Sequence, residues 1–174
     1  MTDAPFAAVV YPPRSNSIGF LGAFADELKK SGIRVGGIIQ DGTVDADGTP
    51  TGINAVDVGT GAKVAINRPT KETRASGACS LDPSGLADAS SILRRAVDDN
   101  VDLIVVDKFG QEEQKGKGLS DEIMLAITEG IPLLISVPEP ALELWQERTG
   151  AIGSVLELQN AALEDWWRQN RRTA

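Results

Sequence analysis

The sequence contains no histidine and a single cysteine, Cys79. The absence of histidine excludes Ser-His-Asp and Cys-His catalysis and most zinc sites. One cysteine excludes an internal disulfide and fits a reducing compartment. A lone cysteine without a histidine is also weak evidence for covalent catalysis.

Aromatic residues make up only 5% of the chain, so the core must consist mostly of Val, Ile, Leu and Ala, which suits a buried parallel sheet. No apolar run approaches the roughly 20 residues that a membrane-spanning helix needs. The N-terminus shows no signal-peptide pattern. We therefore expect a cytoplasmic protein that does not enter a membrane.

Basic residues are outnumbered, and the formal net charge is −8. An acidic surface repels nucleic acid and anionic lipid, so neither is an expected partner. The length of 174 residues predicts a single domain with a sizeable core.

The order of apolar runs predicts an α/β fold. Residues Phe6–Tyr11 form a strand-like run that Pro12 ends, Ser17–Ser31 has helical periodicity, and Ile33–Gln40 is the next strand. Asp41–Pro50 is rich in Gly and Asp and is predicted to be a turn region. The later strands are expected at Ile53–Asp57, Lys63–Asn67, Asp102–Asp107, Ile131–Val137 and Val155–Leu158, and the later helices at Asp82–Asp99, Leu119–Glu129, Ala141–Arg148 and Ala161–Arg171.

This alternation predicts a mostly parallel sheet with helices on both faces and an inserted β-hairpin. Ligands of such sheets bind beyond the carboxyl ends of the strands. The pair Gly36-Gly37 inside a strand predicts a close backbone approach. Trp145, Trp166 and Trp167 are predicted core or dimer contacts.

The loop after the first strand occupies the place of a phosphate-binding P-loop. A working P-loop reads GxxxxGK[ST], with backbone N–H groups and a lysine around the phosphates. Residues Tyr11–Leu21 (YPPRSNSIGFL) have no lysine and only one glycine, Gly19. Pro12 and Pro13 also remove N–H donors. The motif is therefore degenerate, and an intact triphosphate cradle is not expected.

Four polar residues in this loop, Arg14, Ser15, Asn16 and Ser17, precede the predicted helix. A helix N-terminus with free N–H groups, hydroxyls and a guanidinium can hold an oxyanion. The alternative is an ordinary N-cap by Ser15 or Ser17, with a solvated Arg14.

Cys79 and Ser80 precede the second main helix, where Asp82 is a good N-cap before Pro83. One interpretation is a cap beside a small buried cysteine. The other places Cys79 and Ser80 at a bound anion, with the thiol as a soft ligand.

Asp107 ends the most apolar strand, where P-loop enzymes hold magnesium through an acid. Its magnesium role is in doubt without a P-loop lysine or serine. Lys108 follows it and would either neutralise Asp107 or face an anion. The next loop carries Glu112, Glu113, Lys115 and Lys117, which we expect to be solvated, although the loop could close over a ligand.

The segments Leu28–Gly37, Val56–Gly61 and Val101–Gly110 resemble, in this order, the small nucleoside-triphosphatase branch of the P-loop superfamily. The chain is also similar to an uncharacterised bacterial domain-of-unknown-function family encoded beside molybdate-transport ATPases. This likeness rests on Gly36–Gln40, Cys79–Leu86, Lys108–Gly110 with Glu113 and Gly116, and Gly130–Val137. It implies a P-loop-like fold and a molybdenum-related context, without an established reaction.

Three functions follow as hypotheses. The first is a non-hydrolysing protein that binds molybdate or tungstate through Arg14, Ser15, Asn16, Ser17, Cys79, Ser80 and Lys108. The second is a nucleotide-binding or nucleoside-triphosphatase-like protein with an atypical loop, in which Asp107 would order magnesium and Arg14 would replace the lysine. The third is an interaction module without a ligand, which would bind molybdate-transport or molybdenum-cofactor proteins or a second copy of itself. No catalytic residue and no resident metal is expected.

Overall fold

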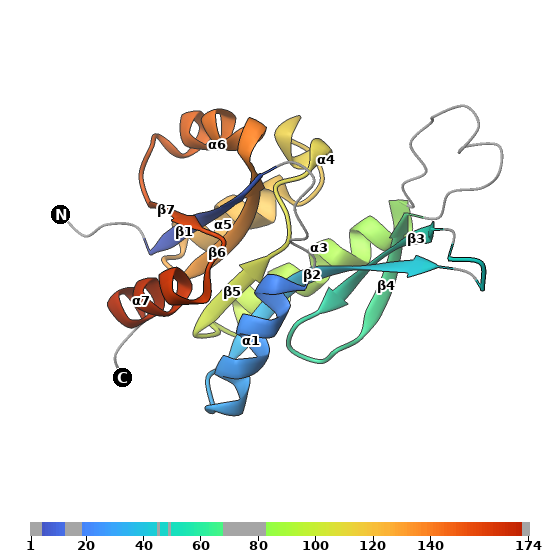
Figure 1. The fold of residues 1–174 in the computed structure, drawn as a ribbon, viewed down its shortest axis with the longest axis horizontal. Helices are drawn as coiled ribbons and strands as arrows, with labels where there is room; N and C mark the ends of the chain where they lie inside the picture. The colour runs from blue at the N-terminus through green and yellow to red at the C-terminus, as the bar shows by residue number, and fades with distance from the viewer. Residues whose placement is uncertain (1–4, 13–18, 45, 49, 68–82, 172–174) are drawn as a thin grey trace.

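The protein is described by a computed structural model over residues 5–12, 19–44, 46–48, 50–67 and 83–171. These residues contain one seven-stranded sheet in the order β4-β3-β2-β5-β6-β1-β7 (Figure 1). Five strands run parallel, and β3 and β4 run antiparallel to their neighbours. The strands are β1 (Phe6–Tyr11), β2 (Val35–Val44), β3 (Pro50–Asp57), β4 (Lys63–Asn67), β5 (Leu103–Val106), β6 (Leu133–Pro138) and β7 (Ser154–Glu157). The mostly parallel sheet and its hairpin are thus confirmed.

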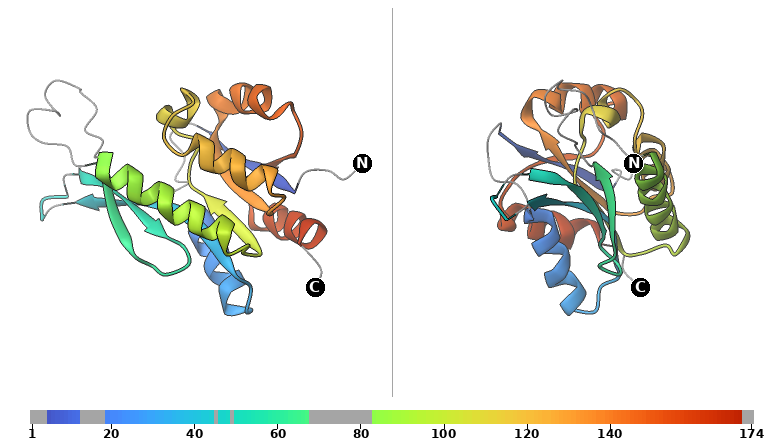
Figure 2. Two further views of the ribbon diagram at one scale, coloured as in Figure 1. Left: turned by 180° about the vertical axis from the view of Figure 1, so that it is seen from behind. Right: turned by 90° about the vertical axis from the view of Figure 1, so that its right-hand side faces the viewer.

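Helices cover both faces of this sheet. Side chains of α3, α5 and α6 join one buried cluster, and those of α1 and α7 join another on the opposite face. Figure 2 shows α3 and α1 on opposite sides of the sheet in its right-hand view. The helices are α1 (Phe20–Lys30), α3 (Pro83–Asp98), α4 (Gln111–Gln114), α5 (Ser120–Thr128), the 3-10 turn η1 (Glu139–Ala141), α6 (Leu142–Thr149) and α7 (Asn160–Asn170).

The central strand β5 is an unbroken apolar run whose side chains are buried on both faces of the sheet. Leu103 and Val105 face the α1/α7 side, whereas Ile104 and Val106 face the α3/α5/α6 side. All four side chains are fully buried. Burial of each such side chain contributes about 1.5–3 kcal/mol. The run LIVV therefore lacks the polar alternation of a strand with one wet face.

The three tryptophans are core residues, as one of the two interpretations predicted. Trp145 on α6 packs edge-on against Phe6 and Phe109, with ring centroids 6.1 and 5.2 Å away. Trp166 and Trp167 on α7 are buried in the opposite cluster. They anchor α6 and α7 to opposite faces of the sheet.

Gly37 lets β2 approach β5 closely, as the Gly36-Gly37 pair predicted. Its φ is +120°, and a Cβ atom there would overlap the carbonyl oxygen of Val105. A Cβ on Gly36 would lie 2.8 Å from the Cβ of Ala96 on α3. The glycines thus permit both the pairing of β2 with β5 and the packing of α3.

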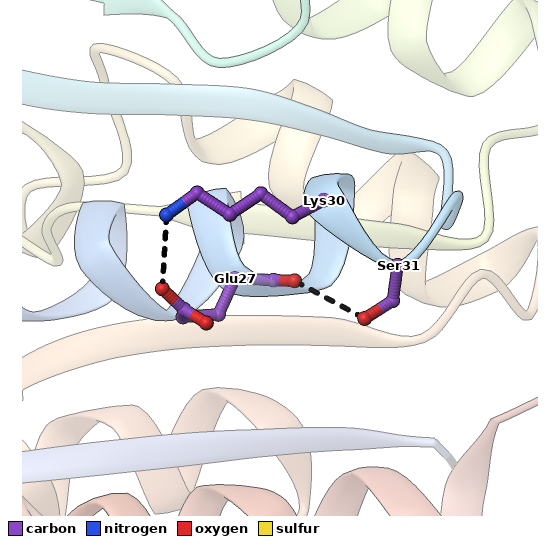
Figure 3. Close-up of polar contacts among 3 residues, drawn as sticks. All are labelled: Glu27, Lys30 and Ser31. Atoms are coloured by element: carbon purple, nitrogen blue, oxygen red, sulfur yellow. Dashed lines mark hydrogen bonds and ion pairs between the residues drawn. The ribbon is translucent and has the colours of Figure 1, made fainter.

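The end of α1 follows from its last residues. Gly32 has a φ of +86° and its N–H donates to Lys29 O, while the N–H of Ile33 donates to Leu28 O. This is the Schellman arrangement, which favours glycine at that position. On the exposed side, Glu27 pairs with Lys30 at 3.2 Å and its carbonyl accepts from the Ser31 hydroxyl (Figure 3).

The turn region predicted at Asp41–Pro50 is wrong for its first four residues. β2 continues to Val44 because β3 runs antiparallel beside it and supplies backbone partners from Asn54 to Pro50. Local composition favoured a turn, but the cross-strand ladder overrides it. The hairpin of β3 and β4 turns at Asp57, whose carboxylate accepts the N–H of Gly59 at 2.8 Å.

Candidate functional site

Parallel strands bring several polar residues to one edge of the sheet. β5, β6 and β1 lie side by side, and their carboxyl ends lead into Asp107, Glu139 and Pro12. The chain leaves β1 for α1 on one face and leaves β6 for α6 on the other. Such a change of direction opens a crevice at the strand ends, where ligands of open α/β sheets bind.

Asp107 is the buried acid of this edge. Its Oδ1 accepts a 2.7 Å hydrogen bond from the Ser136 hydroxyl, and its carboxylate also accepts the backbone N–H of Gln40. Burial raises the pKa of Asp107 above its ordinary value, while the two hydrogen bonds and the charge of Lys108 oppose that rise. The strand ends thus place a carboxyl group between β2 and β6.

Tyr11 and Lys108 are the charged or ionisable neighbours of this acid. Burial, and next the negative charge of Asp107, raise the pKa of the Tyr11 phenol. The end of β1 therefore lies near the end of β5, although β6 separates the two strands. Among the described residues, Lys108 forms no ion pair with Asp107. The peptide bond between Asp107 and Lys108 is cis.

The loop after Lys108 is organised rather than merely solvated, which corrects our expectation for Glu113. The Glu113 carboxylate accepts the N–H groups of Gly110 at 3.2 Å and Leu119 at 3.4 Å, and so joins both ends of the loop. Burial raises the pKa of Glu113, and these hydrogen bonds oppose the rise. Apolar periodicity did not predict the short helix α4. Gly110 is its N-cap, and the hydrogen bond from the Gly110 N–H to the Glu113 carboxylate fixes where the helix begins.

Arg148 holds the same loop from α6. Its guanidinium donates to the carbonyl oxygens of Glu113 and Gln114 and lies 5.6 Å from the centroid of the Phe109 ring. A mainly apolar pocket of about 250 Å³ lies beside it, between Phe109, Met124 and Trp145. The loop is thereby fixed to the α5/α6 side of the sheet.

A larger crevice of about 650 Å³ opens over the ends of β1 and β7. Leu142 borders it from α6, and Leu156 and Leu158 border it from the β7 side. Its charged lining side chains are Glu139 and Glu157. This crevice thus lies next to the change of direction, between the end of β1 and the edge strand β7.

The structure describes one of the seven predicted oxyanion ligands, Lys108. Arg14, Ser15, Asn16, Ser17, Cys79 and Ser80 lie outside the described residues. Helix α1 begins at Phe20 with Gly19 as its N-cap and no side-chain cap, later than the predicted start at Ser17. Ser136 and Glu113 were not among the predicted oxyanion ligands, and their hydrogen bonds to other parts of the site were not predicted.

Two further observations concern the described part of the chain. It contains no group of three or more His, Cys, Asp or Glu side chains arranged to hold a metal ion. None of its helices is long and apolar enough to cross a membrane.

The sheet order, the helices on both faces and the acid at the end of β5 define an α/β protein, with an architecture compatible with P-loop nucleoside triphosphatases. The chain belongs to the family described as "Protein of unknown function (DUF2478)", whose model matches residues 6–166. This confirms the predicted membership of a domain-of-unknown-function family. The likeness to the small nucleoside triphosphatases stays a prediction.

One relative of this chain carries a name that refers to molybdenum import. The chain is 41% identical over 162 residues to a Molybdenum import ATP-binding protein, ModC 2, of Bradyrhizobium diazoefficiens. The match covers 93% of this chain and 18% of that protein, so the chain spans about a fifth of the relative's length. No solved structure matches the chain.

Proposed function

We propose that this protein binds a small tetrahedral oxyanion, molybdate or tungstate, in molybdenum uptake or homeostasis, and does not hydrolyse a nucleotide. The observation that carries the proposal is the 41% identity over nearly the whole chain to part of a molybdenum import protein. The ligands are Arg14, Ser15, Asn16 and Ser17 of the first loop, with Cys79, Ser80 and Lys108.

Charge and placement support this function. Lys108 stands at the carboxyl edge of the sheet without an ion-pair partner among the described residues. A compact dianion needs a few N–H groups, hydroxyls and cations, whereas a nucleoside triphosphate needs the full glycine-rich cradle. The loop sequence YPPRSNSIG contains hydroxyls and a cation for an oxyanion, and it lacks the glycines of a triphosphate cradle.

A nucleotide-binding function is the second candidate, because two observations favour it. Asp107 occupies the strand end at which P-loop enzymes hold magnesium. The crevice of about 650 Å³ is also far larger than one oxyanion needs. If magnesium and a nucleotide bind here, Asp107 is the residue that would hold the metal.

An interaction module is the third candidate. The relative carries a segment like this chain inside a much longer ATP-binding protein, as the 18% coverage shows. Fusion keeps two units at a high effective concentration. A separate chain of this kind would then dock on a molybdate-transport protein.

Thermal unfolding with separate additions of molybdate, tungstate, sulfate, phosphate, Mg-ATP and Mg-GTP tests these functions. A ligand at 100 times its Kd adds about 2.7 kcal/mol to the free energy of unfolding. We expect a shift with molybdate and tungstate that Arg14→Ala and Lys108→Ala abolish and the exposed control Lys117→Ala retains. A shift with the nucleotides alone would replace this function with the second, and no shift at all would favour the third.

A further inference from the structure

The crevice beside the ends of β1 and β7 has a size and lining that the oxyanion function does not use. Its volume of about 650 Å³ falls within the range of roughly 300–1,000 Å³ typical of pockets for organic ligands. Val10 and Pro12 line it at the end of β1, and Glu139 lines it at the start of η1. An organic ligand would therefore fit there.

The apolar walls of the crevice come from both layers of the fold. Leu142 packs against the cluster under α3, α5 and α6, whereas Leu156 and Leu158 pack against the cluster under α1 and α7. The three leucines thus bring apolar surface to the crevice from elements on both faces of the sheet. Apolar lining of this kind favours a ligand with an apolar or aromatic ring.

The polar lining determines which ring fits. The charged residues that line the crevice in the described part of the chain are two carboxylates, Glu139 and Glu157, with no lysine or arginine among them. The Gln159 side-chain amide donates to Oε2 of Glu157 at 3.1 Å, which orients that carboxylate. Carboxylates repel an anion and accept hydrogen bonds, so the ligand must present donors rather than negative charge.

We propose that this crevice binds a planar heterocycle with a 2-amino-4-oxo edge, the edge that guanine and pterin rings share. That edge presents a ring N–H beside an amino group, and one carboxylate can accept both donors in a bidentate pair. The corresponding edge of adenine alternates a donor with an acceptor, so its acceptor would face a carboxylate oxygen. The crevice therefore discriminates against adenine.

Isothermal titration calorimetry with phosphate-free ligands tests this proposal separately from the oxyanion function. The probes are guanosine, pterin, adenosine and spermidine. Binding of guanosine or pterin at least about tenfold tighter than adenosine supports the proposal, and the tighter of the two identifies the source of the ring. Equal binding of adenosine, binding of spermidine alone, or no heat with any probe overturns it.

Matched glutamate variants locate the site. Glu139→Gln and Glu157→Gln keep the shape of the side chain, and we expect at least one of them to weaken guanosine or pterin binding about tenfold or more, the loss of a charge-assisted hydrogen bond. The control Glu143→Gln changes an exposed residue on α6 that does not line the crevice. Unchanged affinity in both crevice variants, with circular dichroism showing native folds, overturns the assignment.

The same variants separate the two proposals. Neither glutamate belongs to the proposed oxyanion ligands, so both variants keep the response to molybdate if that function holds. Ring binding without a molybdate response contradicts the proposed function alone. A molybdate response without ring binding contradicts the crevice assignment alone.

Discussion

The hydroxyl of Ser136 donates a 2.7 Å hydrogen bond to Oδ1 of Asp107 and so joins the carboxyl ends of β6 and β5. Ser136 is only 2% exposed, and it follows three fully apolar, buried residues of β6. A polar residue at this depth needs a partner. The hydrogen bond from Ser136 therefore holds the Asp107 carboxylate in place at the candidate site.

Ser136→Ala removes this support with little change in volume. Hydrogen bonds to charged groups contribute about 1.5–3 kcal/mol, so we expect the free energy of unfolding at pH 7 to fall by about that amount. Urea denaturation measures it. The exposed control Ser154→Ala on β7 should change stability by less than about 0.5 kcal/mol. Equal stabilities of Ser136→Ala and the wild type would show that the hydrogen bond contributes nothing.

Asp107→Asn should remove the pH dependence that burial of this carboxyl gives to the stability of the fold. Because burial raises the pKa of the folded-state carboxyl above 3.8, the stability it supplies is complete below that pH and is lost as pH rises through the folded-state value. An amide avoids the buried charge, but its single oxygen accepts from Ser136 or from Gln40 and not from both. We expect the stability of Asp107→Asn relative to the wild type to fall as pH falls toward 4 in a urea series.

Asp88→Asn, which makes the same substitution at an exposed position on α3, is the matched control. A constant difference between Asp107→Asn and the wild type from pH 4 to pH 8 would contradict the raised pKa of Asp107.

Glu113→Gln should loosen the loop between Lys108 and Leu119. A Gln side chain has one oxygen acceptor, so it satisfies Gly110 or Leu119 but not both. We expect a loss of about 1–3 kcal/mol and faster hydrogen exchange at the amides of Gly110 and Leu119. Glu112→Gln, which removes the ion pair with Lys115 and keeps both hydrogen bonds of Glu113, is the matched control. Equal exchange rates in both variants would assign the loop's order to Arg148 instead.

Gly37→Ala should be among the most damaging single changes in the sheet. The new methyl group would overlap the Val105 carbonyl at a φ of +120°. We expect a loss of more than about 3 kcal/mol in thermal or urea unfolding. Gly48→Ala has a φ of +81° but open space, and should cost about 1 kcal/mol. Similar losses in both variants would mean that β2 shifts away from β5 easily.

Strong periodicity made most of the fold predictable. The run DLIVVD could only be a strand buried on both faces, and the periodic run before Gly32 could only be a helix that ends there. The extension of β2 through Asp41–Val44 was not predictable locally, because its stability comes from pairing with β3. Helix α4 was not predicted either. Its start is fixed by the hydrogen bond from the Gly110 N–H to the Glu113 carboxylate, which apolar periodicity does not reveal.

The candidate site was predictable only in part. Asp107 and Lys108 followed from their place after an apolar strand. The hydrogen bonds that Asp107 accepts from Ser136 and Gln40 did not, because these residues are distant in sequence and meet Asp107 only when β2, β5 and β6 pair. The crevice likewise joins residues of β1, α6 and β7 that no single segment of the sequence identifies.

Equilibrium dialysis against molybdate, with bound molybdenum measured by mass spectrometry, tests whether this protein has a dedicated molybdate site. We expect stoichiometric retention that survives a 100-fold excess of sulfate, is lost in Arg14→Ala and Lys108→Ala, and persists in Lys117→Ala. No retained molybdenum, or complete displacement by sulfate, would contradict a dedicated molybdate site.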